Sequence, residues 1–309
     1  MNRVVVLGSA NSDFTVHAPR LPGPGETVGN GSFEVFFGGK GANQALAALN
    51  CGLEAFLIAR IGTDPHGRAL AEHLIDSGLP QQGIIRDPDH PAGLALIVVD
   101  QSGANQIVVV PGSNGHLSPE DVRRSRDIFT PGSILLTQLE IPLETVTLGL
   151  ELAKAQGMTT ILNPAPFVHL NDRILATTDI MTPNQGEAAG LTGADPGSQS
   201  AIQDGLLSLL SRGMQAILMT MGADGVLLVR RDKTEHLPSY PVQPVDTVAA
   251  GDAFNGALAA GLAAGLPLSK AIRLAGAAGA LCTTRRGAQE SLPVRKEIED
   301  LCGLRFAQS

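Results

Sequence analysis

The feature that most constrains the fold is the alternation of short apolar runs with helical patterns along most of the chain. Three of the helical patterns run up to a glycine, which favours the left-handed conformation that closes a helix. Strands that alternate with helices predict a mainly parallel sheet covered by helices on both faces. The expected strands are Val4–Leu7, Phe56–Ile61, Ile134–Leu139, Thr159–Leu162, Asp179–Met181 and Ala216–Thr220, and the glycine-ended helices are Ala42–Asn50, Arg68–Ser77 and Leu143–Gln156.

Two segments interrupt this alternation and predict a second, smaller β structure. Glu26–Phe37 is strand-like and punctuated by glycine, and Gly93–Val110 contains the apolar runs LALIVV and QIVVV around the turn DQSGA. No helix separates these two runs, so they form a hairpin. We expect a small β lid built from about residues 14–38 and 91–112. Its apolar strands need a cover, which favours contact between the lids of two copies in a homodimer.

Composition excludes several partners. The chain has 309 residues, 43% of them hydrophobic and 17% charged, and a net charge of −8 without any basic run. This balance predicts a globular protein and argues against nucleic acid or an anionic membrane as a partner. Three cysteines without metal-type spacing, Cys51, Cys282 and Cys302, indicate a reducing, cytoplasmic compartment.

One apolar stretch, VAAGDAFNGALAAGLAAGLPL, approaches the roughly 20 residues that span a membrane. Asp252, Asn255 and Pro267 interrupt it, so the stretch predicts a buried helix instead.

Polar residues follow the expected strands, where open parallel sheets bind their ligands. Any one of these residues could be a turn or helix-cap residue, but together they predict a ligand-binding edge of the sheet. They are Asn11, Ser12, Asp13, Glu140, Asn163, Asn184, Glu187, Thr220 and the run Gly222-Ala223-Asp224-Gly225.

The segment GGKGANQ, from Gly38 to Gln44, imitates a phosphate-binding loop but lacks its pattern. Gly41 follows Lys40 where the pattern G-x-x-x-x-G-K-[ST] requires Ser or Thr, and no strand-linked G-x-G-x-x-G is present. The glycines allow a ligand to approach the backbone, and Lys40 and Asn43 offer donors. A glycine-rich start of a helix explains the same residues.

The segment DTVAAGDAFNG, from Asp246 to Gly256, places Asp252 beside Gly251 at the expected start of a helix, Ala253–Ala264. Free N–H groups at such a start form an anion site. Phosphoryl transfer needs such donors together with a base for the attacking hydroxyl, and Asp252 has the position for that base. A carboxylate that only stabilises the helix terminus is the alternative.

These motifs occur in one chain in the order Asn11-Ser12-Asp13, GGKGANQ, PNQGE and DTVAAGDAFNG, and this chain resembles the ribokinases of the PfkB carbohydrate kinase family. LNPAP at Leu162–Pro166 and TRRGAQ at Thr284–Gln289 strengthen the likeness, which runs from Val4 to about Pro293. The resemblance implies one α/β/α three-layer domain over residues 1–309 with a β lid that also forms the dimer contact. It implies transfer of the γ-phosphate of ATP to the 5-hydroxyl of D-ribose.

The resemblance also implies roles for individual residues. Asp252 would be the base and Gly251 part of the anion hole, and Glu187 would act on Mg²⁺ through water. The sugar would be held by Asn11, Asp13, Gly39, Lys40, Asn43, Glu140 and Asp252. The nucleotide would lie along Asn184, Thr220, Gly222, Ala223, Asp224, Gly225, Gly251 and Gly276. An activating K⁺ would be bound by Asp246, Val248, Cys282, Gly287 and Ser291, the cysteine through its main-chain carbonyl.

The sequence departs from the family near the adenine, where Gly276 replaces a larger polar residue that many ribokinases carry. Two other functions stay open. One is a kinase for another acceptor, such as deoxyribose, fructose or a nucleoside, because Val35, Phe36 and Phe37 of the lid do not decide between them. The other is a non-catalytic sugar-binding sensor.

Overall fold

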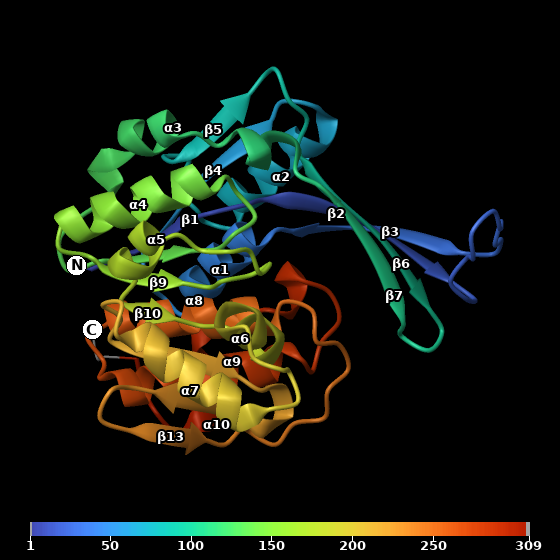
Figure 1. Cartoon of the computed structure of the whole chain (residues 1–309). Helices are drawn as coiled ribbons and strands as arrows, with labels where there is room; N and C mark the ends of the chain where they lie inside the picture. Colours follow the sequence, from blue (N-terminus) through green and yellow to red (C-terminus); the bar gives the residue numbers. More distant parts are fainter. Residues whose placement is uncertain (1, 307–309) are drawn as a thin grey trace.

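The computed structural model describes residues 2–306, and a nine-stranded sheet forms their centre (Figure 1). Pairing is parallel from β5 through β11, whereas β12 and β13 are antiparallel additions at one end, so the predicted mainly parallel sheet is confirmed. The strand order is β13 (Thr234–Leu237), β12 (Val226–Val229), β11 (Ala216–Thr220), β10 (Ile180–Met181), β9 (Thr159–Leu162), β8 (Ile134–Thr137), β1 (Val4–Leu7), β4 (Ala55–Gly62) and β5 (Ile84–Asp87).

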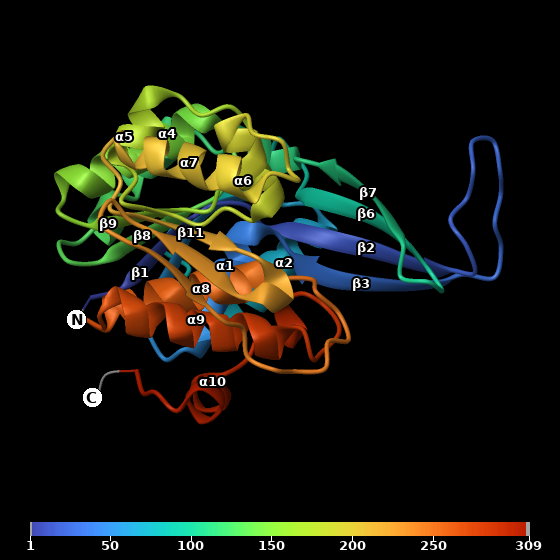
Figure 2. The same ribbon diagram turned by 60° about the horizontal axis from the view of Figure 1, so that its bottom comes forward.

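Helices cover both faces of this sheet, because side chains alternate between the faces along each strand. In β1, Val4 and Val6 join one core, and Val5 and Leu7 join the other. The first core includes side chains of α1 (Lys40–Asn50), α2 (Pro65–Asp76), α8 (Ala250–Ala263), α9 (Leu268–Cys282) and α10 (Arg295–Cys302). The second includes side chains of α3 (Pro119–Arg124), α4 (Leu143–Ala155), α5 (Asp172–Thr177), α6 (Gln185–Thr192) and α7 (Gln199–Leu210). The three-layer α/β/α architecture is therefore confirmed (Figure 2).

A separate four-stranded sheet forms the lid and projects from one side of the main body (Figures 1 and 2). Its order is β3 (Ser32–Gly38), β2 (Asn11–Ala18), β6 (Gly93–Asp100) and β7 (Asn105–Val110), and β6 and β7 are the predicted hairpin. Asn11 to Asp13 begin strand β2, so these polar residues belong to the lid sheet and do not form a loop after β1.

Local signals explain where some helices begin earlier than the sequence patterns indicated. Helix α2 begins at Pro65, because the Asp64 carboxylate accepts hydrogen bonds from the amides of His66 and Gly67. Helix α8 begins at Ala250, after Ala249 in a left-handed conformation (φ 59°), and its interior is buried as expected. Asp252 therefore lies inside the first turn of α8. Within residues 2–306, no helix is long and apolar enough to cross a membrane.

Candidate active site

The site lies at the topological switch point of the main sheet, where successive strands are added first on one side of β1 and then on the other. From β1 the chain adds β4 and β5 on one side and later returns to place β8 on the other side. Ligands bind at such switch points, beyond the carboxyl ends of the strands. Here the Glu140 carboxylate, after β8, accepts hydrogen bonds from the Ser9 hydroxyl (2.5 Å) and the Lys40 main-chain amide (3.1 Å). The first strand, its neighbour and helix α1 are thereby tied together.

Asp252 is buried and held at both carboxylate oxygens by amides of helix α1. The Asn43 side-chain amide donates to Oδ2 (2.9 Å) and that of Gln44 donates to Oδ1 (2.8 Å). Gln44 also donates to Asn163 Oδ1 (3.0 Å) and accepts a hydrogen bond from Gln138 Nε2 (2.5 Å). This network fixes the carboxylate in one orientation, as a catalytic base requires.

The charges around Asp252 oppose one another. Burial raises the pKa of Asp252, and Lys40 and the two amides lower it without cancelling the rise. Burial alone would lower the pKa of Lys40, but the carboxylates of Asp252, Glu140 and Glu187 raise it above its usual value. The lysine therefore stays cationic beside a carboxylate that binds protons more readily than a solvent-exposed one.

Asp13 and Asn11 reach the same region from lid strand β2. Burial, with the charges of Glu140, Glu290 and Asp252, raises the pKa of Asp13 to about 7. Asp13 Oδ1 and Asn43 Oδ1 are buried and lack partners within residues 2–306. Asn11 Oδ1 accepts a hydrogen bond from Asn114 Nδ2 (2.7 Å). Unpaired buried acceptors are costly, so they mark a place where a ligand with hydroxyl donors fits.

The glycines of the GGKG segment have a packing role that the sequence analysis did not assign. A side chain at Gly39, whose φ is 88°, would lie 2.7 Å from the backbone of Ala10, and one at Gly41 would lie 2.6 Å from Gly8. One at Gly38 would collide with the Asp13 carboxylate. The glycines thus let the start of α1 approach the β1–β2 connection closely.

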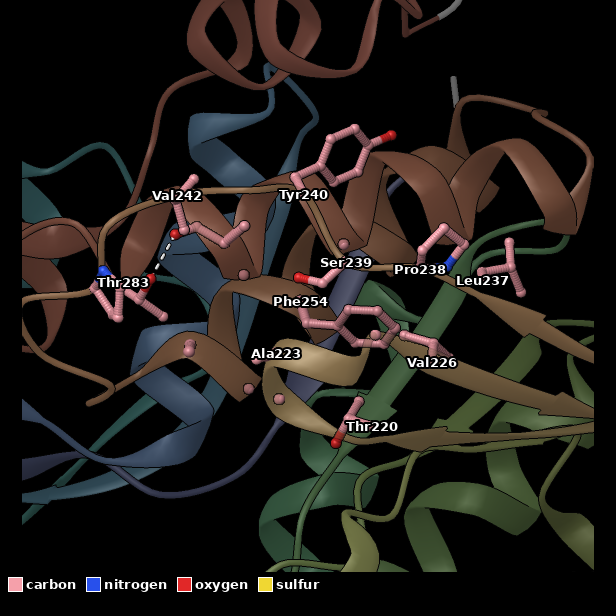
Figure 3. Close-up of a pocket in the computed structure, with 18 of the residues that line it drawn as sticks. Thr220, Ala223, Val226, Leu237, Pro238, Ser239, Tyr240, Val242, Phe254 and Thr283 are labelled. Atoms are coloured by element: carbon pink, nitrogen blue, oxygen red, sulfur yellow. Dashed lines mark hydrogen bonds between the residues drawn. The ribbon is translucent and has the colours of Figure 1, made fainter.

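A cavity of about 730 Å³ opens beside the first turn of α8 (Figure 3). Apolar side chains of Val226, Leu237 and Phe254 surround it, with Thr220 and Thr283 among its polar lining residues. Of the residues expected at the nucleotide, those lining it are Thr220, Gly222, Ala223, Gly225, Gly251 and Gly276. Asp224 and Asn184 are exposed and do not line it.

Two further features of this cavity suit a nucleotide. The main-chain amides of Gly251 and Asp252 find no hydrogen-bond acceptor in the described chain, and a side chain at Gly251 would meet nothing within 4 Å. These amides are free donors at a helix N-terminus, where an anion is stabilised. Beside Gly276, the ring of Tyr240 lies 3.7 Å from where a Cβ would stand.

Asn184 and Glu187 form a capping box at the start of α6. Each side chain accepts a hydrogen bond from the other's main-chain amide at 2.8 Å. Burial raises the pKa of Glu187, which the Asn184 amide and the nearby Lys40 lower in part. Asn184 also forms a bridge with Thr220 at the edge of β11, so both residues lie near the cavity wall.

The five residues expected at a monovalent cation lie together, and we call them the cation-loop cluster: Asp246, Val248, Cys282, Gly287 and Ser291. The Asp246 carboxylate accepts hydrogen bonds from the amides of Val248 (3.0 Å) and Gly287 (3.2 Å). The Cys282 thiol donates to the Val248 carbonyl (3.5 Å) and contacts the Ser291 hydroxyl (3.0 Å). The cluster therefore gathers carboxylate, carbonyl and hydroxyl oxygens, which are the ligands of a hard cation.

Four residues that build this site had no role predicted from the sequence. Ser9 donates a hydrogen bond to Glu140, and Gln44 donates one to Asp252. Gln138 donates to Gln44, and Asn114 donates to Asn11. Gln44 ends the GGKGANQ segment and Gln138 directly follows β8, so both stood within recognised signals. Asn114 lies in a turn 103 residues from Asn11, and no local pattern indicates their contact.

Comparison with known proteins agrees with this geometry. The pfkB family carbohydrate kinase model matches residues 1–295. A ribokinase of Haemophilus influenzae is 37% identical over 294 residues, covering 95% of this chain and 96% of that protein. The crystal structure of a ribokinase of Thermotoga maritima superposes with a TM-score of 0.90 at 35% identity, covering 98% of this chain and all of that one.

A structure of Arabidopsis thaliana ribokinase complexed with ribose and ATP superposes with a TM-score of 0.88 at 30% identity, covering 98% of this chain and all of that one. These matches cover nearly the whole length of both chains. The chain belongs to the pfkB family of carbohydrate kinases.

Proposed function

We propose that this kinase transfers the γ-phosphate of ATP to the 5-hydroxyl of D-ribose. The observation that carries the proposal is the Asp252 carboxylate, buried and fixed by Asn43 and Gln44 between the polar residues of the lid and the open amides of α8. The similarity to ribokinases, one of them complexed with ribose and ATP, supports the choice of substrates.

In this proposal Asp252 accepts the proton of the attacking hydroxyl. Its raised pKa suits that step, because the carboxylate takes up the proton more readily as the oxygen attacks phosphorus. Asn43 and Gln44 keep the carboxylate oriented while the proton moves. The amides of Gly251 and Asp252 stabilise the charge that develops on the transferred group.

The sugar would bind between the lid and helix α1. Asp13 and Asn43 offer unpaired oxygens to its hydroxyls, and Asn11, Gly39, Lys40 and Glu140 complete the surrounding set. Lys40 remains cationic and balances part of the negative charge of this region. The adenine would occupy the apolar part of the cavity, along Thr220, Gly222, Ala223, Gly225 and Gly276, while Asn184 and Asp224 stay at its edge.

Two cations would assist. Mg²⁺ supplies charge neutralisation of the phosphates, and Glu187 would hold one of its waters, since Mg²⁺ keeps most of its water shell. K⁺ would be bound by the cation-loop cluster, whose oxygens fit it and which adjoins the first turn of α8. A bound cation there would strengthen the positive potential at the open amides.

The exposed apolar lid strands support a homodimer formed lid to lid. Ile107, Val108 and Val109 of β7 are 53%, 61% and 51% exposed, an unusual run for a surface strand. We place the protein in the cytoplasm, because its three cysteines are free and buried.

The test is an ADP-release assay over ribose, deoxyribose, fructose and a nucleoside, each with K⁺ and with tetramethylammonium. The proposal expects ribose to have the highest kcat/KM and K⁺ to raise the rate. A higher kcat/KM for one of the other acceptors would replace ribose. Binding of sugar without any turnover would favour the sensor.

A further inference from the structure

Strand β3, helix α2 and the short 3₁₀ turn η4 (Gln289–Ser291) meet at the base of the lid. The ring of Phe37, near the end of β3, stacks on the imidazole of His73 in α2, with ring centres 4.6 Å apart and planes 30° apart. His73 Nε2 is hydrogen-bonded to Gln289 Oε1 (2.9 Å) in η4. A single side chain, His73, therefore connects the lid, helix α2 and η4.

Strand β3 is held by its pairing with β2 along its whole length and, at Phe37, by packing on the main body. Within residues 2–306 it pairs with β2 alone, and Ser32 to Val35 are exposed. Phe37 is the side chain of β3 that packs on the main core. Gly39 and Lys40 follow Phe37 by two and three residues, so the position of Phe37 influences the position of these two proposed sugar-binding residues.

On the other side of the contact, the side chain of Gln289 is buried, with 9% of its surface exposed. Its Nε2 has no hydrogen-bond partner in the described part of the chain. It borders a cavity of about 140 Å³, lined by Leu46, Asn50, His73, Ser77, Gln289 and Glu290. The hydrogen bond to His73 fixes the orientation of the Gln289 amide. Without that bond the amide can turn into the adjacent cavity, because there is space for it there.

The turn η4 carries two neighbours of the site. Glu290 acts electrostatically on Asp13 and lies beside Gly287, where a Cβ would stand 2.9 Å from its carboxylate. Ser291 belongs to the cation-loop cluster. A shift of η4 would therefore move charge relative to Asp13 and alter the cluster.

We infer that His73 is a positioning residue that preorganises the lid strand β3 and η4 around the sugar, and so sets sugar affinity. The inference rests on the proposed sugar site but not on the identity of the sugar. With the contact formed, β3 is already in place, and the ordering cost that binding must overcome is lower. The effect cannot exceed the contribution of the contact itself, so its loss weakens sugar binding about two- to tenfold.

The experiment compares His73→Phe, which keeps a ring on Phe37 but loses the hydrogen bond, with Gln289→Leu and with the double variant. Sugar affinity is measured by calorimetry, and KM and kcat are measured for the panel sugar that the wild type phosphorylates fastest. His169→Phe is the control, because His169 also contacts a phenylalanine, Phe167, but edge-on, with ring centres 5.5 Å apart, and at an exposed position away from the lid.

Both single variants are expected to bind sugar two- to tenfold more weakly, with the KM for ATP within about twofold of the wild type. The double variant should be no weaker than either single one, since they break the same bond. Each single variant should melt at a lower temperature than the wild type, because it leaves one polar atom of the broken bond unpaired. The double variant should melt near the wild-type temperature, because neither partner is then polar, while its sugar affinity stays low.

Unchanged affinity in His73→Phe would overturn the inference, and so would a double variant that regains affinity together with its melting temperature. In the second case the bond acts only through stability. Absence of turnover in the wild type would overturn the proposed function instead, and calorimetry would still report on His73.

Discussion

Replacing Asp252 with Asn tests whether this carboxylate is a base or a helix-terminal stabiliser. The change keeps the size of the side chain and removes its charge and its ability to accept a proton. Loss of a general base lowers the rate by roughly 10²- to 10⁴-fold. We expect kcat to fall at least about 10²-fold, which corresponds to about 2.7 kcal/mol of activation free energy.

The structure predicts a small effect of the same change on stability. An Asn side chain has one oxygen, so either Asn43 or Gln44 loses its acceptor, which costs roughly 1.5–3 kcal/mol for a bond to a charged group. The opposite contribution comes from the buried charge. Burial raises the pKa of Asp252, which means that the folded protein disfavours the ionised form. The two terms oppose each other, so the melting temperature should change by no more than about 4 °C.

The assay pairs initial rates of ADP release at saturating ribose and ATP with thermal unfolding of the same preparations. Asp204→Asn, on the exposed face of α7, is the matched control and should leave both values unchanged. If Asp252→Asn keeps wild-type turnover while its melting temperature drops by 10 °C, the carboxylate only supports the helix. The proposed mechanism would then be wrong.

The raised pKa of Asp13 makes the sugar-free protein bind more protons than the unfolded chain between about pH 4 and pH 7, so its stability falls as pH rises through that window. The melting temperature plotted against pH should therefore have different slopes for the wild type and Asp13→Asn between about pH 4 and pH 7, and the same slope above pH 7. Equal slopes below pH 7 would contradict the assignment. Gly222→Ala should be tolerated at a cost of about 1–2 kcal/mol, because only its positive φ of 57° opposes a side chain. Gly225→Ala, with a Cβ 2.1 Å from a backbone oxygen, should also raise the KM for ATP, and similar ATP kinetics in the two variants would argue against this wall of the cavity. Val109→Lys removes about 1.5 kcal/mol of apolar burial from each copy of a lid dimer. The dissociation constant of the dimer, measured by light scattering, should therefore rise roughly a hundredfold.

Several elements were predictable because their signals are local. The parallel strands follow from short runs of three to six residues, and the hairpin of β6 and β7 from two apolar runs around a turn. The β lid and the three layers followed from the same alternation and its interruptions. The boundaries moved where a cap decided them, as Asp64 did for α2 and the left-handed Ala249 did for α8.

Other features appear only when distant segments meet. Asn11 to Asp13 follow β1 in sequence, but pairing with β3 and β6 makes them part of the lid. The glycines of GGKG stood out in the sequence, but only the structure shows that Gly39 and Gly41 pack against the backbone of Gly8 to Asn11. Both partners of each of these contacts can be read in the sequence, but no sequence pattern predicts that they lie next to each other.

By itself the sequence determined the fold class, the lid hairpin and the candidate base, because each depends on the order and chemistry of neighbouring residues. Only the tertiary structure decided how Asp252 is held, since its partners Asn43 and Gln44 lie 209 and 208 residues away. It also decided the link from Phe37 through His73 to Gln289, which spans 216 residues between its hydrogen-bonded partners. Contacts of that separation depend on packing between layers, and no local pattern encodes them.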